Sequence, residues 1–120
     1  MSALRLSLSA LAAMPVEVAR PDYDPGTVAT GIVHLGLGAF HRAHQAVYTD
    51  AILRSDPRWG ICGVSLKTPR ATAALAAQDG LYTVLEKGAA GTSGRVIGAL
   101  RETLFLGASR DRVIARIADP

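Results

Sequence analysis

The segment at residues 31–44, GIVHLGLGAFHRAH, holds the residue types best suited to chemistry in this chain. It predicts an apolar strand that runs into Gly36 and Gly38 and is followed at once by a helix beginning near Phe40. Gly36 permits a sharp exit from the strand, and Gly38 lets the backbone come close to a pyrophosphate, which the N–H groups around Phe40 to Arg42 at the start of the helix would bind. The pattern predicts a dinucleotide-binding turn, although His41 stands where the generic G-x-G-x-x-G fingerprint has its third glycine.

The end of the second predicted strand bears on which dinucleotide the turn would bind. In NAD-binding sites an acidic residue at this point holds the adenine ribose hydroxyls, but here the sequence is LKTPR, residues 66–70. Lys67 and Arg70 could contact the 2′-phosphate of NADP, or they could simply be solvent-facing charges. Asp56 belongs to a helix-to-strand turn at the other end of the sheet. These residue types leave the choice between NAD and NADP open.

Two further groups of residues have types that could do chemistry, but each lacks part of what a site needs. His34, His41 and His44 fall within eleven residues, but no carboxylate or cysteine completes a metal site locally, so we expect no metal centre. We assign His41 and His44 instead to fixing the turn. Tyr82 and Lys87 have the wrong spacing for the Tyr-Lys pair of short-chain dehydrogenases and lie in a predicted strand. Because no pair places a base beside a nucleophile, no catalytic residue is predicted.

Composition narrows the class of protein. The chain has 120 residues, 49% of them hydrophobic and 19% charged, which fits one globular unit with a core. The net charge of +3 comes from scattered Lys and Arg residues without interleaved aromatics, so nucleic-acid binding is not expected. The single cysteine, Cys62, lies in an apolar run and predicts a buried small hydrophobe in a reducing cytoplasm. Serines, Pro15 and Glu17 interrupt the apolar N-terminus, which argues against a signal peptide or a membrane span.

The elements that must position these groups follow from hydrophobic patterning. Strands are predicted at 31–37 and 60–66, because both runs are apolar on both faces, as in buried parallel strands. A helix is predicted over 40–54, with Ala43, Ala46, Val47 and Ile52 facing inward, and a second helix over 70–77, capped by Thr68. A hairpin of strands 81–85 and 95–100 is predicted around a flexible loop at 87–94. A last helix is predicted to be capped by Ser109 and to face inward with Val113, Ile114 and Ile117.

This order of elements predicts an α/β fold, the first part of a doubly wound, Rossmann-like parallel sheet with a β-hairpin insertion. Such a sheet needs further strands after the last helix, so we expect the fold to be truncated in this chain, as a fragment of a longer protein. The turn cluster PDYDPG, residues 21–26, separates two parts. Residues 1–29 are expected to be a lead-in segment with a helix packing on the domain, and residues 30–120 a partial dinucleotide-binding domain.

The motif IVHLGLGAFHRAHQA, residues 32–46, closely resembles the signature of the mannitol dehydrogenase family, the polyol-specific long-chain dehydrogenases. The histidine at the third glycine position is itself part of that family's pattern. Further stretches that look like the family are YTD at 48–50, WGICGV at 59–64, QDGLYT at 78–83 and the lead-in LSALAAMP at 8–15. The sequence GVSL at 63–66, together with QDG at 78–80, resembles the fructuronate reductases of this family slightly more than its mannitol dehydrogenases.

That resemblance implies reversible hydride transfer between NAD and a secondary alcohol or ketone of a linear polyol or hexuronate, of the mannitol/fructose or mannonate/fructuronate type. The family's catalytic lysine belongs to a helical C-terminal substrate domain, so no catalytic residue carries over and this chain alone is expected to be inactive. The polyol or sugar acid would bind through that missing domain, and NADP is not excluded as the cofactor. The NAD-binding residues that the resemblance implies are Ile32, Val33, His34, Leu35, Gly36, Leu37, Gly38, Ala39, Phe40, His41, Arg42 and Ala43.

Two alternatives from other classes stay open at this point. One is a non-catalytic nucleotide-binding module, which needs only the glycine turn. The other is a metal-binding protein that uses His41 and His44.

Overall fold

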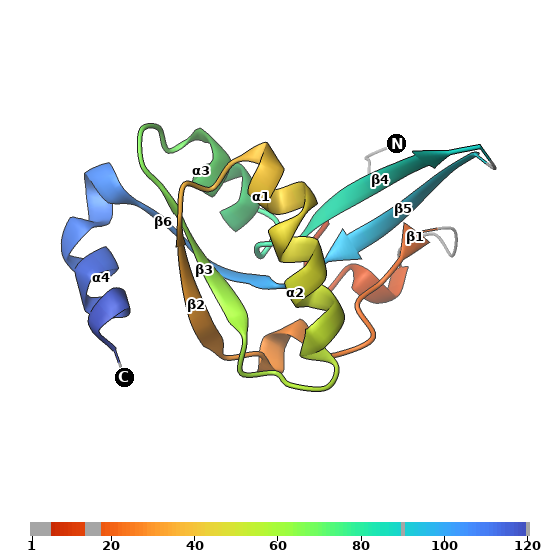
Figure 1. Ribbon diagram of the computed structural model, residues 1–120, viewed down its shortest axis with the longest axis horizontal. Coiled ribbons are helices and arrows are strands. Elements are labelled where there is room, and N and C mark those ends of the chain that lie inside the picture. Colours follow the sequence, from red (N-terminus) through yellow and green to blue (C-terminus); the bar gives the residue numbers. More distant parts are fainter. Residues whose placement is uncertain (1–5, 14–17, 90, 120) are drawn as a thin grey trace.

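Three parallel strands form the main sheet, in the order β2-β3-β6 (Figure 1). They are β2 (Thr30–Leu35), β3 (Gly60–Ser65) and β6 (Leu100–Phe105). Because the strands run in one direction, their carboxyl ends meet at one edge of the sheet, where ligands of open α/β folds bind. The predicted α/β, Rossmann-like parallel sheet is thereby confirmed. The computed structural model describes residues 6–13, 18–89 and 91–119.

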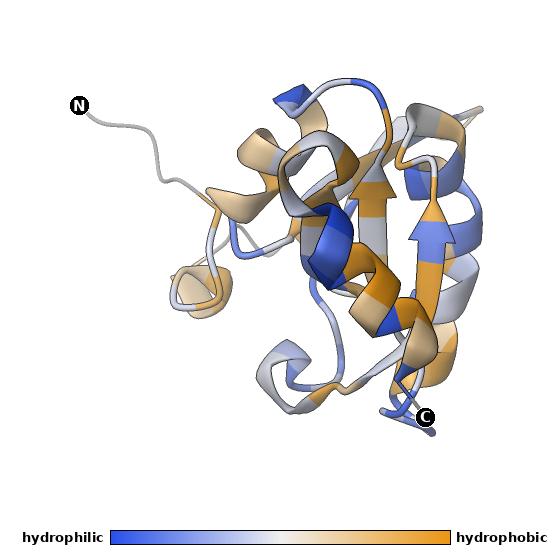
Figure 2. Cartoon of the chain, turned by 90° about the vertical axis from the view of Figure 1, so that its left-hand side faces the viewer, coloured by the Kyte–Doolittle hydropathy of each residue, from blue (hydrophilic) through white to orange (hydrophobic). Residues whose placement is uncertain are grey.

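The central and edge strands of this sheet differ in burial. Every residue of β3 is buried, as its unbroken apolar sequence predicts. The prediction of a fully buried first strand is wrong, because β2 lies at an edge and its residues are half-buried or exposed. Leu35 is 52% exposed there. The strands are nevertheless coloured as largely hydrophobic in Figure 2, where α4 (Leu106–Ala118) crosses in front of them.

The predicted helix over 40–54 is broken into α1 (Ala39–Ala43) and α2 (Gln45–Leu53) by His44, whose φ of −125° and ψ of −76° are not helical. The break changes which residues face the sheet. The buried row of α2 is Ala46, Asp50 and Leu53. The predicted inward residues Ala43 and Ile52 are exposed, Ile52 by 54%, and Val47 is half-buried.

The last two helices also depart from their predicted caps and faces. In α3 (Arg70–Ala76) the cap is Pro69 rather than Thr68, and the Thr72 hydroxyl donates to the Pro69 carbonyl at 2.9 Å. Helix α4 begins at Leu106 and kinks at the predicted cap Ser109. Of the residues predicted inward, Val113 is buried, whereas Ile114 and Ile117 are 54% and 58% exposed. Only one row of α4 therefore packs on the sheet.

A second sheet carries the predicted hairpin, β4 (Tyr82–Gly88) and β5 (Gly91–Ile97), with the short β1 (Val18–Ala19) beside β5. The hairpin projects from the main sheet in Figure 1. The predicted flexible loop at 87–94 is wrong, because the ladder continues to the pair Gly88–Gly91. The predicted strand over 95–100 is two strands, since β5 ends at Ile97 and β6 begins at Leu100. The third parallel strand, expected only after the last helix, is therefore β6.

The N-terminal segment lies on the hairpin. Leu6 is buried against Leu81 and Val96, and Ala10 is also buried. Of the predicted lead-in helix, the described residues form only the 3₁₀ turn η1 (Leu11–Ala13), and residues 6–10 before it are not helical. Residues 1–5 and 14–17, on which the prediction also falls, lie outside the described part. In the described part of the chain, no helix is long and apolar enough to cross a membrane.

A fully buried carboxylate joins these parts. Asp50 of α2 accepts hydrogen bonds from the Tyr23 hydroxyl, from the Gly98 N–H at 2.9 Å and from Arg95 at 3.2 Å. Tyr23 precedes the second 3₁₀ turn, η2 (Pro25–Thr27), and burial together with Asp50 raises the pKa of its hydroxyl. The network holds α2, the hairpin and the segment before β2 in one arrangement.

Candidate functional site

The turn after β2 is shaped by one glycine with a positive φ and one extended glycine. Gly36 has φ of +99°, a conformation that favours glycine, and its N–H and that of Leu37 both donate to the Val64 carbonyl, at 2.9 and 3.1 Å. Gly38 is extended, with φ of −119° and ψ of −179°, so its backbone would accept other residues. A Cβ at Gly38 would meet nothing closer than 4.0 Å. Its lack of a side chain therefore matters only if a ligand lies against it.

A hollow of about 360 Å³ opens beside this turn, at the carboxyl ends of β2 and β3. It lies where the chain leaves these strands for α1 and α3 (Figure 1). The structure thus brings the two predicted glycines together with the residues that follow β3. The lining residues are Gly36, Leu37, Gly38, Ser65, Leu66, Lys67, Thr68 and Ala71.

Ser65 is a site residue that the sequence reasoning missed. It is 6% exposed and lines the hollow, and its hydroxyl has no hydrogen-bond partner among the described residues. A buried hydroxyl without a partner costs on the order of 1–3 kcal/mol, so such a group marks a place where a ligand or water binds. The available signal was a polar residue ending an otherwise apolar buried strand.

His41, which stands where the generic fingerprint has its third glycine, is buried against the preceding strand. Its ring stacks on that of His34 in β2, with 3.7 Å between centroids and 10° between planes. The stacked rings join α1 to β2 at the position where the generic fingerprint has its third glycine. The Nδ1 atom of His41 donates to Gln45 Oε1 at 3.1 Å, and burial is the main cause that lowers the His41 pKa. The buried Nε2 atom has no partner among the described residues.

The predicted N–H donors at the start of the helix need correction. The Arg42 N–H, expected to contact a pyrophosphate together with those of Phe40 and His41, already donates to the Gly38 carbonyl at 3.1 Å. In addition α1 has only five residues, so it supplies far less dipole than the predicted fifteen-residue helix. What remains are the N–H groups of the first helical turn, Ala39 to His41, which have no acceptor within a helix.

His44 has a local role at the same turn. Its Nδ1–H donates to the Phe40 carbonyl at 2.9 Å and its ring stacks on Phe40. This fits the prediction that His44 helps to fix the turn. Within the described ranges, no group of three His, Cys, Asp or Glu residues is placed to hold a metal ion.

The remaining predicted candidates lie apart from the hollow or have structural partners. Asp56 accepts bonds from Arg58 and Trp59 on the turn before β3, and the Arg58 guanidinium lowers its pKa. The Tyr82 hydroxyl donates to the Arg42 carbonyl at 2.7 Å, and burial raises its pKa. Cys62 is fully buried, and burial raises its thiol pKa to about 11. The prediction that Cys62 is buried is thereby confirmed, and an un-ionised, enclosed thiol is a poor nucleophile.

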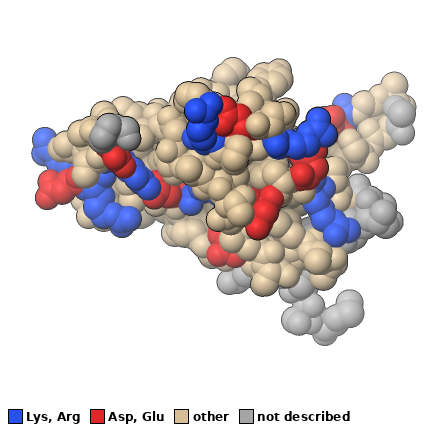
Figure 3. All heavy atoms as spheres, turned by 90° about the horizontal axis from the view of Figure 1, so that it is seen from below, with Lys and Arg blue, Asp and Glu red and all other residues tan. Residues whose placement is uncertain are grey.

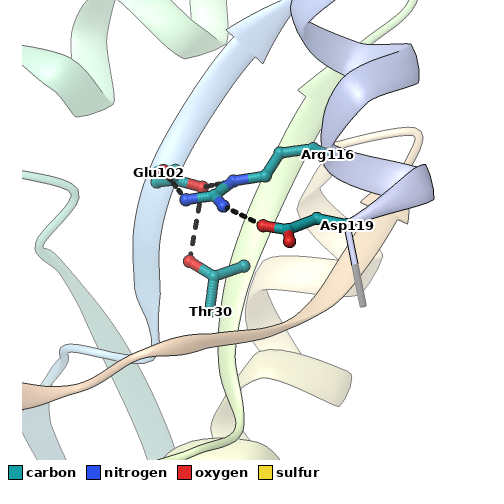
Figure 4. Close-up of polar contacts among 4 residues, drawn as sticks. All are labelled: Thr30, Glu102, Arg116 and Asp119. Carbon is teal, nitrogen blue, oxygen red and sulfur yellow. Dashed lines mark hydrogen bonds and ion pairs between the residues drawn. The ribbon is translucent and has the colours of Figure 1, made fainter.

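A second hollow, of about 370 Å³, lies between β2 and α4. Its polar groups are paired (Figure 4). Arg116 of α4 forms a two-pronged ion pair with Glu102 of β6, with Nε to Oε2 at 2.7 Å, and also contacts Asp119 at 3.1 Å. Thr30 donates to Glu102 at 3.3 Å. The Arg116 guanidinium lowers the pKa of the Glu102 carboxyl. This cluster fastens α4 to the sheet.

The fold and the turn together define a Rossmann-type domain: three parallel strands in the order expected of a first nucleotide-binding half, with a glycine turn facing a hollow at their carboxyl ends. The family model described as the mannitol dehydrogenase Rossmann domain matches residues 30–120. The chain therefore belongs to the mannitol dehydrogenase family, as the sequence resemblance indicated.

Relatives in sequence and structure agree with this assignment. The chain is 46% identical over 104 residues to a mannitol 2-dehydrogenase of Pyricularia oryzae, which covers 83% of this chain and 21% of that protein. It is 47% identical over 107 residues to one from Pyrenophora tritici-repentis, covering 86% and 19%. A solved ternary complex of Pseudomonas fluorescens mannitol 2-dehydrogenase with NAD and D-mannitol superimposes with a TM-score of 0.91 at 39% identity, covering 98% of this chain and 25% of that one. The chain thus spans about a fifth of the length of these curated relatives.

Proposed function

We propose that this chain is the dinucleotide-binding part of an oxidoreductase that transfers a hydride between a nicotinamide cofactor and a secondary alcohol or ketone of a linear polyol or hexuronate. The observation that carries the proposal is the hollow between the Gly36–Gly38 turn and the end of β3, with an unpartnered hydroxyl in its lining. The Pseudomonas relative that binds NAD and D-mannitol supports the same reaction.

The residues present fit a dinucleotide. Gly38 leaves open space where a side chain would otherwise stand, and the first N–H groups of α1 face no acceptor within the helix. The proposed binding segment remains Ile32 to Ala43, with the pyrophosphate against Gly36–Gly38. When bound, the nicotinamide would supply the hydride donor or acceptor. This chain's own residues would bind and orient the dinucleotide, while Leu37 holds the turn against the core.

The domain division and the rest of the enzyme are part of the proposal. We take residues 1–29 as a lead-in segment and 30–120 as a partial NAD-binding domain, with the polyol or sugar acid held by a separate helical domain. The relatives' greater length supports this division. Mannitol/fructose and mannonate/fructuronate remain the two proposed substrate types, and the cytoplasm the proposed compartment. On this proposal the 120-residue chain alone binds cofactor without turning over substrate.

Gly38→Val tests the site. A valine there would occupy the space proposed for the pyrophosphate, so calorimetric binding of NADH and NADPH by the chain should be lost while its thermal unfolding changes little. Gly88→Val is the matched control, because a Cβ at Gly88 also meets nothing closer than 4.0 Å but lies on the hairpin. Dinucleotide affinity that survives Gly38→Val would overturn the proposed function.

A further inference from the structure

A row of large side chains lies exposed along α1 and α2, which follow one another end to end in Figure 1. Phe40 is 77% exposed, Tyr48 71% and Ile52 54%, and the exposed His44 stands between the first two. Side chains four residues apart lie on one face of a helix. These four residues, the α1–α2 row, therefore form a single outer surface, opposite the residues that α2 buries against the core.

The row is continuous although the helix is broken at His44. The His44 N–H donates to the Phe40 carbonyl at 3.0 Å, and the Tyr48 N–H donates to the His44 carbonyl at 3.1 Å. The His44 ring also stacks on that of Phe40, with 4.4 Å between the ring centroids. The helical spacing of four residues is thus kept across the break.

The helix surface around the row carries no charge. Over residues 43–53 the one Asp, Glu, Lys or Arg is Asp50, which is fully buried. A helix that meets only solvent usually has charged side chains on its outer face, and a contiguous exposed apolar surface marks contact with another protein. Without Lys or Arg, this surface has no electrostatic attraction for nucleic acid or an anionic lipid surface.

Two polar groups of the row complement each other between two copies of the chain. The Nδ1–H of His44 donates to the Phe40 carbonyl, which leaves Nε2 as an acceptor that no described residue reaches. The Tyr48 hydroxyl, which can donate, also has no partner among the described residues. A two-fold axis midway between His44 and Tyr48 would bring the histidine of each copy to the tyrosine of the other.

We propose that the α1–α2 row is a docking surface for a second copy of this chain, packed antiparallel so that Phe40 meets the partner's Ile52 and His44 meets the partner's Tyr48. This inference does not depend on dinucleotide binding. With about 200 Å² for each large side chain, the exposed parts of Phe40, Tyr48 and Ile52 come to roughly 400 Å² per copy. Twice that area lies at the lower end of specific interfaces, so we expect a weak dimer.

Sedimentation equilibrium of the 120-residue chain tests the association. The weight-average mass should rise from that of a monomer toward that of a dimer between about 5 and 500 µM, the range of a micromolar dissociation constant. Ile52→Glu places a charge in the row and should weaken association at least about tenfold. Ile114→Glu is the matched control, because Ile114 on α4 is also 54% exposed, and it should leave association unchanged.

Disulfide cross-linking tests the antiparallel packing. Cys62 is fully buried, so a cysteine introduced on the surface is the one that reacts. A mixture of Ile52→Cys and Phe40→Cys chains should form mixed dimers. Ile52→Cys alone should not cross-link, because its two copies would lie about 18 Å apart along the helices, beyond the reach of a disulfide.

Three results would overturn the inference. They are a wild-type chain that stays monomeric over the whole concentration range, an Ile52→Glu chain that associates as strongly as Ile114→Glu, and efficient cross-linking of Ile52→Cys alone. In the first case the row would be left for the separate helical domain of the proposed enzyme to cover.

Discussion

Two hollows of nearly equal size, about 360 and 370 Å³, lie on the main sheet and differ in how their polar groups are satisfied. At the carboxyl ends of β2 and β3, Ser65 has a buried hydroxyl without a partner and Lys67 has no ion pair within the described part of the chain. Beside α4, by contrast, Arg116 binds both Glu102 and Asp119. Size does not distinguish a ligand site from a structural gap, but unsatisfied polar groups do.

The charged side chains on the surface resemble the paired cluster beside α4. On the face drawn in Figure 3, acidic and basic side chains lie next to each other, and no large area carries one sign. Paired charges of this kind contribute to stability modestly and leave little to attract a ligand. We expect substitutions beside α4 to change stability, and substitutions beside the glycine turn to change dinucleotide affinity.

The largest expected effect comes from a pair of matched leucine truncations. Leu37 in the turn and Leu104 in β6 are each 7% exposed, in different core clusters. Leu37→Ala and Leu104→Ala should each lower the free energy of unfolding by about 2–3 kcal/mol, measured in urea. Only Leu37→Ala should also weaken dinucleotide binding, because Leu37 anchors the turn. Equal loss of affinity in both variants would break the comparison between the two regions.

A smaller effect is expected from the ion pair beside α4. Glu102→Gln keeps the shape of the side chain and removes the charge that binds Arg116, so stability at pH 7 should fall by about 1 kcal/mol, a modest figure because both side chains are one-third exposed. Dinucleotide affinity should not change. Glu86→Gln, at an exposed position on the hairpin, serves as the control. A loss of affinity in Glu102→Gln would mean that this cluster is coupled to the binding site.

The same variant has a signature in the pH dependence of unfolding. Because the Glu102 pKa is lowered in the folded state, its contribution is present above the ordinary carboxyl pKa and is lost as the pH falls through the lowered value. The wild-type chain should therefore lose stability more steeply than Glu102→Gln as the pH is lowered from about 5 to 3. Parallel curves over that range would contradict the pairing.

The smallest effect is expected at His41. Burial lowers its pKa, so the folded state binds the proton less readily than the unfolded state and stability is lost as the pH falls below about 6.5. His41→Gln should remove this part of the pH dependence, by less than about 1 kcal/mol in thermal unfolding between pH 7 and 5. His44→Gln, at an exposed neighbour, should retain it. If His41→Gln kept this pH dependence and His44→Gln removed it, the titrating group would not be His41.

Short sequence patterns predicted much of this fold. The unbroken apolar run of β3, the glycine turn and the hairpin depend on neighbouring residues, and all three are confirmed. The family followed from the same turn, because its histidine pattern is specific. The boundary between β5 and β6 was missed because Val96–Leu100 is a continuous apolar run, which hides the break at Gly98 and Ala99. A Cβ at Gly98 would lie 2.8 Å from the Tyr23 hydroxyl, a contact no local pattern reveals.

By itself, the sequence determined the α/β class, the family and the glycine turn, because each depends on residue types and short spacings. Tertiary structure alone decided which polar groups are satisfied. Glu102 meets Arg116 fourteen residues away and Asp50 meets Gly98 forty-eight residues away, whereas Ser65 meets no partner among the described residues. Burial makes each of these outcomes energetically significant, and burial is set by how distant segments pack.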